Sequence, residues 1–412
     1  MTEPYLQALA GAEPYPYWLD DPDEPDSLDT LVHADTADLC VIGGGYTGLW
    51  TAILAKERDP SRDVVVLEAA TCGSAASGRN GGFFESSLTH GAAQGLDRFA
   101  KEVAFLEQLG LDNLNAIEAF VEKYRIDCDW ERNGVIDVLT DVALLDDLQH
   151  SYHELVGLNQ DVELFDRERM QAEVHSPTYQ AGMYRKRRAA ICDPARLAFG
   201  MKDVALDLGV RIFEDTKATD IAAEGHGVRV QAGYGSIRSA RVALATNAFP
   251  PLVKSMKRRI VPVYDYCLAT EPLSAQQLDS IGWRGRQGLG DTTNQFHYYR
   301  LTQDNRIIWG GYDAVYYFGN KMGQALEQRP ETFSLLSQHF HTTFPQLEGL
   351  GFSHAWGGAI DTSTRFTVFW GTEMNGRVAY RRRLHGSRRR GSRWRQGDAR
   401  PPRWSGDSGD RS

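Results

Sequence analysis

The sequence DLCVIGGGYTGLWTAIL, residues 38–54, decides the fold expected for this chain. It places the pattern G-x-G-x-x-G between an apolar, strand-forming run and an apolar helical segment. In such a unit Gly43 permits the tight turn, Gly45 lets backbone approach a pyrophosphate, and Gly48 lets helix and strand pack closely. The helix N-terminus also presents free N–H groups and the positive end of its dipole. The pattern predicts a dinucleotide site that includes Gly43, Gly45, Tyr46, Thr47 and Gly48.

A second strand strengthens this interpretation. The apolar run Val64 to Leu67 ends in Glu68, 25 positions after Gly43. A carboxylate at that place can accept hydrogen bonds from both hydroxyls of an adenosine ribose. We therefore predict a Rossmann-like α/β unit with Glu68 and Ala69 at the ribose. The alternative is a glycine-rich turn followed by a solvated glutamate.

The next loop, CGSAASGRNGGF at residues 72–83, favours FAD over NAD. Its small residues let the backbone run close to a large flat ligand. Arg79 can balance the charge of a pyrophosphate. A flexible surface loop would have a similar composition. The residues that this loop adds to the expected cofactor site are Ser77, Gly78, Arg79, Asn80, Gly81 and Gly82.

Composition limits the class of protein. The chain has 412 residues, of which 42% are hydrophobic, enough for two domains with substantial cores. The net charge of −10 argues against a nucleic-acid partner. No apolar run reaches the roughly 18 residues of a membrane span, and the acidic, Pro-rich N-terminus does not read as a signal peptide. Five scattered cysteines fit reduced thiols, so we expect a cytoplasmic protein without membrane contact.

The ordered set of motifs resembles the D-amino-acid-oxidase-like superfamily of FAD-dependent oxidoreductases. Within it the likeness is greatest to gamma-glutamylputrescine oxidases and to the neighbouring glycine/sarcosine oxidases. It extends over residues 37–380. Besides GGGYTGLWTA and ASGRNGG, it rests on YRIDCDW (124–130), ATNA (245–248), YRLTQDNR (299–306), FPQL (344–347) and WGG (356–358).

The resemblance implies a mixed α/β (α+β) fold in which a Rossmann-like FAD-binding domain is built from discontinuous segments. A second domain with a mixed sheet would supply the substrate pocket. The expected division is an N-terminal arm at 1–36, an FAD-binding domain at 37–98, 188–258 and 346–380, a substrate domain at 99–187 and 259–345, and a basic tail at 381–412.

The resemblance also implies a chemistry, the oxidation of a C–N bond in a small amine or amino acid. Hydride would pass to the flavin, the imine would hydrolyse, and oxygen would reoxidise the flavin to give hydrogen peroxide. A gamma-glutamylputrescine-like amine is the expected substrate. The alternatives are a glycine/sarcosine-type oxidase or dehydrogenase, and an inactive truncated protein.

The expected substrate pocket is aromatic. Aromatic walls on the strands of the second domain could hold an aliphatic amine chain and offer hydroxyls to its ends. Ordinary sheet packing is the alternative for each of these residues. The candidates on these strands are Tyr264, Tyr266, His297, Tyr298, Tyr299, Trp309 and Tyr312, of which Tyr264, Tyr266, His297 and Tyr299 are the favoured catalytic residues.

Further site residues follow from the resemblance. Arg365 is expected near the flavin, where it could bind a carboxylate or the pyrimidine edge, although a solvated arginine is an equal alternative. Thr246 and Asn247 complete the expected FAD site. Lys254 and Lys257 could favour oxygen reduction, but exposed lysines are the better default. No metal is expected, because no histidine pair has convincing further ligands nearby in the sequence.

The last 32 residues differ from the rest in composition. Residues 381–412 hold eleven Arg and three Asp, a net charge of +8. In the resembled family the strand at 376–380 runs into a glycine-rich turn and a closing helix. We therefore expect a reading-frame shift near codons 380–383, a disordered tail and poor flavin retention. The alternative is a basic tail that binds RNA or an anionic surface.

Overall fold

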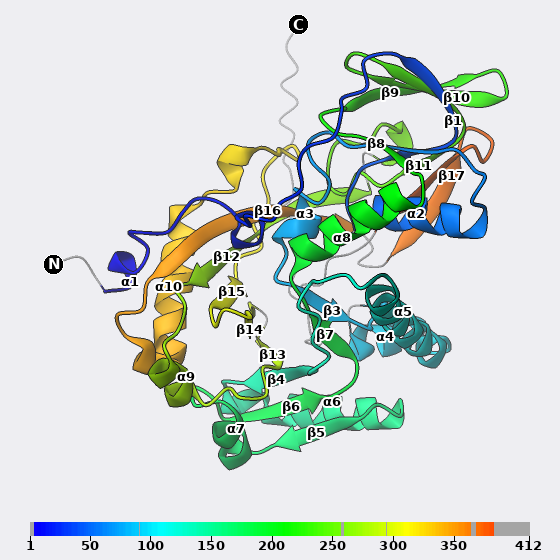
Figure 1. Ribbon diagram of the computed structural model, residues 1–412. Helices are drawn as coiled ribbons and strands as arrows, with labels where there is room; N and C mark the ends of the chain where they lie inside the picture. Colours follow the sequence, from blue (N-terminus) through cyan, green and yellow to red (C-terminus); the bar gives the residue numbers. More distant parts are fainter. Residues whose placement is uncertain (1–3, 90, 257–258, 294, 364–367, 383–412) are drawn as a thin grey trace, which may run out of the picture.

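The computed structural model describes residues 4–382 except 90, 257–258, 294 and 364–367 (Figure 1). The expectations for Arg365, Lys257 and the tail at 383–412 lie outside these residues, as does the side chain of Lys254. Within the described part the chain forms two large mixed sheets and the helices that cover them, which confirms the expected mixed α/β class.

The first sheet contains the strand that opens the glycine pattern. Its main path is β17 (Phe369–Glu373), β18 (Val378–Arg382), β11 (Ser236–Leu244), β1 (Ala34–Ile42), β2 (Val64–Leu67) and β8 (Arg211–Phe213). The antiparallel strands β9 (Ala218–Glu224) and β10 (Gly227–Ala232) extend it from β11. β1 pairs in parallel with both β2 and β11, so their carboxyl ends meet at one edge. The predicted second strand and final strand are both confirmed.

Two helices pack together beside this sheet. α2 (Tyr46–Arg58) follows the glycine turn, and α8 (Pro194–Asp207) packs against it. Asp193 caps α8, because its Oδ1 accepts hydrogen bonds from the N–H groups of Ala195 and Arg196 at 2.9 and 3.0 Å. The short helix α3 (Ala76–Arg79) packs against α8.

The second sheet carries the other core. Its order is β16 (Phe352–Ser363), β12 (Ile260–Thr270), β15 (Ile307–Gly311), β14 (His297–Leu301), β13 (Gly288–Asp291), β4 (Val135–Leu139), β6 (Ala181–Arg185) and β5 (Val162–Phe165). Helix α10 (Pro330–Thr343) packs on one face through Phe333, Leu336 and Phe340. A separate two-stranded sheet, β3 (Phe83–Glu85) and β7 (Ala189–Ile191), lies between the large sheets in Figure 1.

Residues 92–124 contain two helices, α4 (Ala92–Phe99) and α5 (Val103–Tyr124). α5 packs against α2, where the rings of Phe120 and Trp50 lie 4.5 Å apart between centroids. We propose that α5 belongs with the first sheet and β16 with the second, whereas the sequence division placed them the other way round. Segment 346–380 therefore contributes to both sheets.

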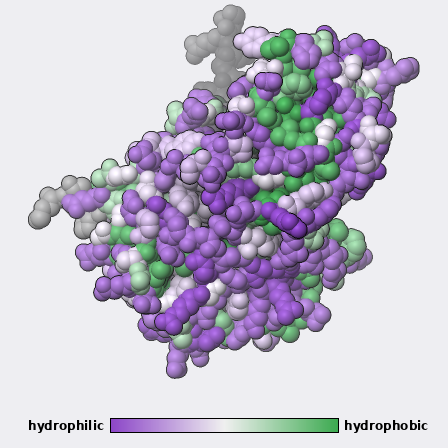
Figure 2. Space-filling model, in the orientation of Figure 1, coloured by the Kyte–Doolittle hydropathy of each residue, from purple (hydrophilic) through white to green (hydrophobic). Residues whose placement is uncertain are grey.

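The surface is mostly hydrophilic in the view of Figure 2, with an apolar area over the region of the first sheet. Within the described ranges no helix combines the length and the apolarity that crossing a membrane requires. All five cysteines are buried and free, and Cys40 of β1 belongs to the core of the first sheet.

Candidate active site

The glycine turn after β1 is as tight as the sequence predicts. Gly43 has a φ of +110°, a conformation that L side chains rarely adopt. A Cβ added at Gly48 would lie 1.8 Å from the carbonyl oxygen of Gly43. The N-cap of α2 is Gly45, so no side chain covers the first turn of this helix from that position. The turn therefore has the backbone shape that a pyrophosphate cradle requires.

Glu68 lies beside this turn at the end of β2. Its Oε2 accepts a hydrogen bond from the N–H of Gly44 at 2.6 Å, and its Oε1 accepts one from Ala70 at 3.0 Å. Burial raises the pKa of this carboxyl above its usual value. Two backbone N–H groups thus hold the carboxylate of Glu68, which is predicted to bind the ribose, at the carboxyl edge of the sheet next to Ala69.

The end of β11 closes the same edge. A Cβ added at Gly43 would lie 2.6 Å from the carbonyl oxygen of Ala245, which shows how closely the two segments approach. Thr246 and Asn247 follow, and Asn247 has a φ of +42°. The structure therefore brings Ala245 and Thr246 to the glycine turn, and FAD binding by Thr246 and Asn247 stays a prediction.

The loop at residues 76–82 is ordered by its own side chains. The hydroxyl oxygen of Ser77 accepts a hydrogen bond from the N–H of Tyr46 at 3.0 Å, at the start of α2. Asn80 donates through Nδ2 to the carbonyl oxygens of Ala76 and Ser77 and accepts from the N–H of Gly82 at 2.9 Å. These hydrogen bonds hold the loop in one conformation beside the start of α2, unlike a flexible surface segment. Gly78, Gly81 and Gly82 lie buried within it.

Arg79 has a different environment from the one predicted. Its Nη1 forms an ion pair with Glu327 at 2.5 Å, and its Nε donates to the carbonyl oxygen of Ser74 at 2.7 Å. The backbone oxygen of Arg79 accepts a hydrogen bond from the indole of Trp356. In this structure the guanidinium therefore joins the loop to Glu327, and its expected role at a pyrophosphate stays a prediction.

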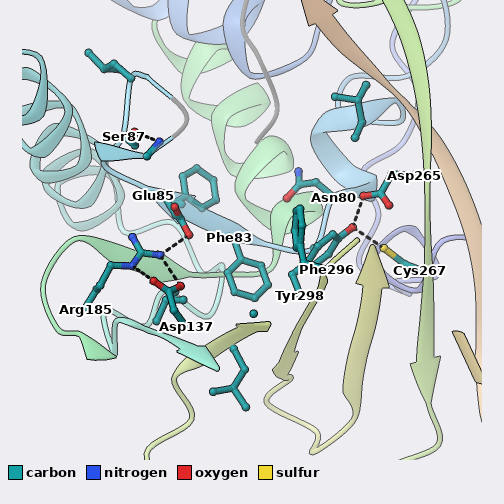
Figure 3. Close-up of a pocket in the computed structure, with 18 of the residues that line it drawn as sticks. Asn80, Phe83, Glu85, Ser87, Asp137, Arg185, Asp265, Cys267, Phe296 and Tyr298 are labelled. Carbon is teal, nitrogen blue, oxygen red and sulfur yellow. Dashed lines mark hydrogen bonds and ion pairs between the residues drawn. The ribbon is translucent and has the colours of Figure 1, made fainter. Parts of the chain in front are cut away.

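A cavity of about 280 Å³ opens between this loop and the second sheet. Asn80 and Gly81 line it from the loop, and Phe83 and Phe296 line it with aromatic rings (Figure 3). Ala359 and Ile360 contribute from β16. A mixed apolar and polar cavity next to a cofactor cradle is the default candidate for a substrate site.

Three polar side chains of the second sheet form one end of the cavity. The hydroxyl of Tyr298 donates to Oδ2 of Asp265 at 2.7 Å and lies 3.1 Å from Sγ of Cys267. Burial raises the pKa of the Asp265 carboxyl to about 6, and it also raises the pKa of the Cys267 thiol. Asp265 is therefore a buried carboxyl group with a raised pKa in a candidate reaction site.

The favoured aromatic residues of the second sheet pack in the core beside α10, and their catalytic role stays a prediction. Tyr264 and Tyr266 on β12 and Tyr299 on β14 belong to the core under α10, and none of the three lines the cavity. The hydroxyls of Tyr299 and Tyr179 lie 2.7 Å apart in that core. Trp309 and Tyr312 also pack there.

His297 lies on the same face of β14 as Tyr299. Its Nδ1 lies 2.7 Å from Oδ2 of Asp291, its Nε2 lies 3.0 Å from Nδ1 of His339, and its ring stacks on Trp309. Successive side chains of a strand point to opposite faces. The neighbours of these core residues, Asp265, Cys267 and Tyr298, therefore line the cavity.

Asp265 and Cys267 were missed by sequence reasoning, and Tyr298 was named only as one of a larger aromatic set. The available signal was a carboxylate in an otherwise apolar strand, IVPVYDYCLAT at residues 260–270. An acidic residue in such a run is costly to bury unless it is paired or functional.

The opposite end of the cavity is also charged. Arg185 on β6 forms ion pairs with Asp137 on β4 and Glu85 on β3, and all three side chains line the cavity (Figure 3). Within the described ranges no three His, Cys, Asp or Glu side chains gather in a way that could hold a metal ion.

The chain was compared with known proteins. A family model described as FAD dependent oxidoreductase (DAO) matches residues 38–384. The chain is 30% identical to gamma-glutamylputrescine oxidoreductase of Escherichia coli K12 over 84% of this chain and 79% of that protein. It is 29% identical to the probable oxidoreductase OrdL of Haemophilus influenzae, over 86% of this chain and 80% of that protein.

Solved structures share the fold. Glycine oxidase from Geobacillus kaustophilus superposes with a TM-score of 0.71 at 17% identity, covering 85% of this chain and 90% of that one. L-Proline dehydrogenase from P. horikoshii gives a TM-score of 0.69 at 18% identity, with coverages of 86% and 89%. The region that the family model matches, residues 38–384, contains the glycine turn, the loop at 76–82 and the residues that line the cavity. The chain belongs to the DAO family of FAD-dependent oxidoreductases.

Proposed function

We propose that this FAD-dependent oxidoreductase oxidises the C–N bond of a small amine of the gamma-glutamylputrescine type, with oxygen as the electron acceptor. The observation that carries the proposal is the cavity between the loop at 76–82 and the second sheet, with the carboxyl group of Asp265 in its wall. The sequence relative from Escherichia coli is named for that substrate.

The cofactor site supports the proposal because its residues fit FAD. The glycine turn leaves no room for a Cβ at Gly48, and Glu68 lies at the ribose position of a dinucleotide fingerprint. Gly43, Gly45 and the first turn of α2 would hold the pyrophosphate. The chemistry that FAD supplies when bound is acceptance of a hydride from the carbon that carries the amine.

Asp265 has a direct part in this proposal. An aliphatic amine is an ammonium ion at neutral pH, whereas hydride loss requires the neutral amine. The carboxylate of Asp265 would pair with the ammonium and accept its proton, and a pKa of about 6 suits such a group. The hydroxyl of Tyr298 holds Oδ2 of this carboxylate, and the apolar walls at Phe83 and Phe296 exclude water.

The charges of the cavity bear on where a substrate carboxylate could bind. Among the described residues that line it, both arginines are already paired, Arg79 with Glu327 and Arg185 with two carboxylates. Recognition of a substrate carboxylate would have to compete with these ion pairs. A glycine- or sarcosine-type oxidase is the second candidate, favoured by the fold shared with glycine oxidase.

The experiment is an absorbance titration of the FAD-loaded protein without oxygen. We expect gamma-glutamylputrescine or a related primary amine to bleach the flavin band, and peroxide to form when air is admitted. Faster bleaching by glycine or sarcosine would support the second candidate. If no amine or amino acid bleaches the flavin of a fully loaded sample, both candidates are wrong.

A further inference from the structure

Arg300 is a buried charged residue beside the candidate site. It has no exposed surface. It stands on β14 two residues after Tyr298, so the two side chains point to the same face of the strand. Among the described residues that line the cavity, Tyr298 is included and Arg300 is not. Arg300 can therefore act on the site only through the elements that it contacts.

The guanidinium of Arg300 contacts carbonyl oxygens and an aromatic ring. Its Nη1 donates to the backbone oxygen of Cys192, which directly precedes the cap of α8, and to that of Gly82 at 3.4 Å. Its Cζ lies 5.2 Å from the ring centroid of Trp18. The N–H of Cys192 also donates to the backbone oxygen of Gly82, at 3.0 Å. Arg300 thus joins the end of the loop at 76–82 to the start of α8.

β14 packs against this loop at two consecutive glycines. A Cβ added at Gly81 would collide with the ring of Tyr298, and one added at Gly82 would lie 2.5 Å from Nη1 of Arg300. Gly82 also has a φ of +76°, a conformation that favours glycine. Its N–H donates to Oδ1 of Asn80 at 2.9 Å. The last residue of the loop is thus fixed by Asn80 from within the loop and by Arg300 from the second sheet.

Stability alone does not account for a charge at this place. Within the described part of the chain, Nη2 of Arg300 has no hydrogen-bond partner. The charges of Glu131 and Asp193 act on the guanidinium, but Glu131 pairs with Arg286 and Asp193 caps α8. Burying a charge is costly, and an apolar side chain of similar volume is often at least as stable in such a place. What an apolar residue could not supply is the donor that joins the loop to α8.

We propose that Arg300 is a positioning residue that holds the loop at 76–82 in the conformation that receives FAD. It acts through the backbone of Gly82 and Cys192, so that the loop, α8 and the cavity wall of β14 keep one relative arrangement. The inference rests on the proposed place of FAD beside this loop. It does not depend on which amine is oxidised.

The test compares Arg300 with a matched arginine away from the loop. Arg306 also donates to a backbone oxygen, that of Thr270 at 3.1 Å, and its Cζ lies 5.3 Å from the ring centroid of Tyr17. Arg306 is not among the described residues that line the cavity. Arg300→Met and Arg306→Met are each purified with FAD bound, and the loaded proteins are diluted. The fluorescence that released flavin regains gives the dissociation constant of FAD, and thermal unfolding shows which variants have folded.

We expect Arg300→Met to raise the dissociation constant of FAD by roughly 10- to 100-fold. At saturating FAD the shoulders of its visible flavin band should still be weaker than in the unaltered protein, because the loop no longer has one conformation. Arg306→Met should change neither the dissociation constant nor the spectrum. Arg300→Lys keeps the charge over Trp18 and should fold, but its side chain is one atom too short for the two carbonyl oxygens. We expect it to weaken FAD binding by less than Arg300→Met does.

A double-mutant cycle locates the effect at Gly82. Asn80→Ala removes the acceptor of the Gly82 N–H. Because both side chains fix the same residue, Asn80→Ala and Arg300→Met together should weaken FAD binding by less than the product of their separate effects. Glu68→Gln with Arg300→Met is the control cycle, since Glu68 accepts from Gly44 at the glycine turn, and these effects should multiply.

The outcomes separate this inference from the proposed function. Unchanged FAD binding by a folded Arg300→Lys or Arg300→Met protein overturns the inference and leaves the proposed function intact. The same is true if Arg306→Met weakens FAD binding equally, or if the effects of Asn80→Ala and Arg300→Met multiply. If the unaltered protein binds no FAD, the proposed cofactor site is wrong, and the proposed function is wrong with it.

Discussion

The glycine turn of the first sheet and the cavity wall of the second sheet are two polar sites built in different ways. The turn is formed by closely packed backbone atoms, and Gly43 and Gly48 are required because any side chain there would collide with them. The wall is formed by side chains of β12 and β14, whereas alternate residues of the same strands belong to the core. A backbone site leaves a fixed sequence pattern, whereas a side-chain site depends on which phase of a strand faces the cavity.

The largest expected effect tests the backbone site. In Gly48→Ala the new Cβ would meet the carbonyl oxygen of Gly43 at 1.8 Å, so the turn must open. We expect nearly complete loss of FAD and a loss of about 3 kcal/mol in the free energy of unfolding. FAD absorbance per polypeptide and denaturant unfolding measure both. Gly157→Ala is the control, since a Cβ there meets nothing within 4 Å. Normal FAD binding by Gly48→Ala would show that this turn does not hold the cofactor.

The next effect tests the side-chain site through its pH dependence. Asp265 has a pKa of about 6, so amine oxidation should decline as pH falls through 6 and the carboxylate is protonated. Asp265→Asn should remove this limb and lower kcat/KM by roughly 100-fold. A pH profile of kcat/KM for both proteins checks the result. Retention of the acid limb in the variant would assign it to another group.

Stability should respond to the same residue with the opposite sign. The pKa of Asp265 is raised from 3.8 to about 6 by folding, so its protonated form favours the folded state. This contribution is complete below pH 4 and is lost as pH rises through 6. Asp265→Asn, which cannot ionise, should therefore lose less stability than the unaltered protein between pH 4 and pH 7. Parallel unfolding curves at the two pH values would contradict this.

The smallest effects compare two adjacent tyrosines on opposite faces of β14. Tyr298→Phe removes the hydroxyl that donates to Asp265, so the pKa of Asp265 should rise and the acid limb should move to higher pH. Tyr299→Phe removes only a contact with the hydroxyl of Tyr179, and should cost about 1 kcal/mol of stability without moving the limb. Equal pH profiles for the two variants would show that the face of the strand does not matter.

The sequence predicted the first sheet far better than the second. Gly43, Gly48 and Glu68 could be placed because their roles follow from backbone geometry and fixed spacing. Tyr264, Tyr266 and Tyr299 lie on the expected strands but pack in the core, and their catalytic role stays a prediction. The sequence could not decide which face of these strands lines the cavity, because both faces are buried and no polar alternation marks the phase. The far end of the cavity escaped prediction because Glu85, Asp137 and Arg185 come from three strands distant in the chain.

The N-terminal arm crosses both halves of the protein. Glu13 exchanges backbone hydrogen bonds with Ser353 and Ala355 of β16 at 2.8 and 2.9 Å. Trp18 is buried beneath the guanidinium of Arg300.

Further along, the N–H of Leu28 donates to Glu214, whose carboxylate also pairs with the buried Lys202 of α8. The arm thus makes hydrogen bonds beside both sheets, and it should restrain a hinge motion between them. Cleavage of the arm should therefore lower the stability of the whole protein rather than that of one loop.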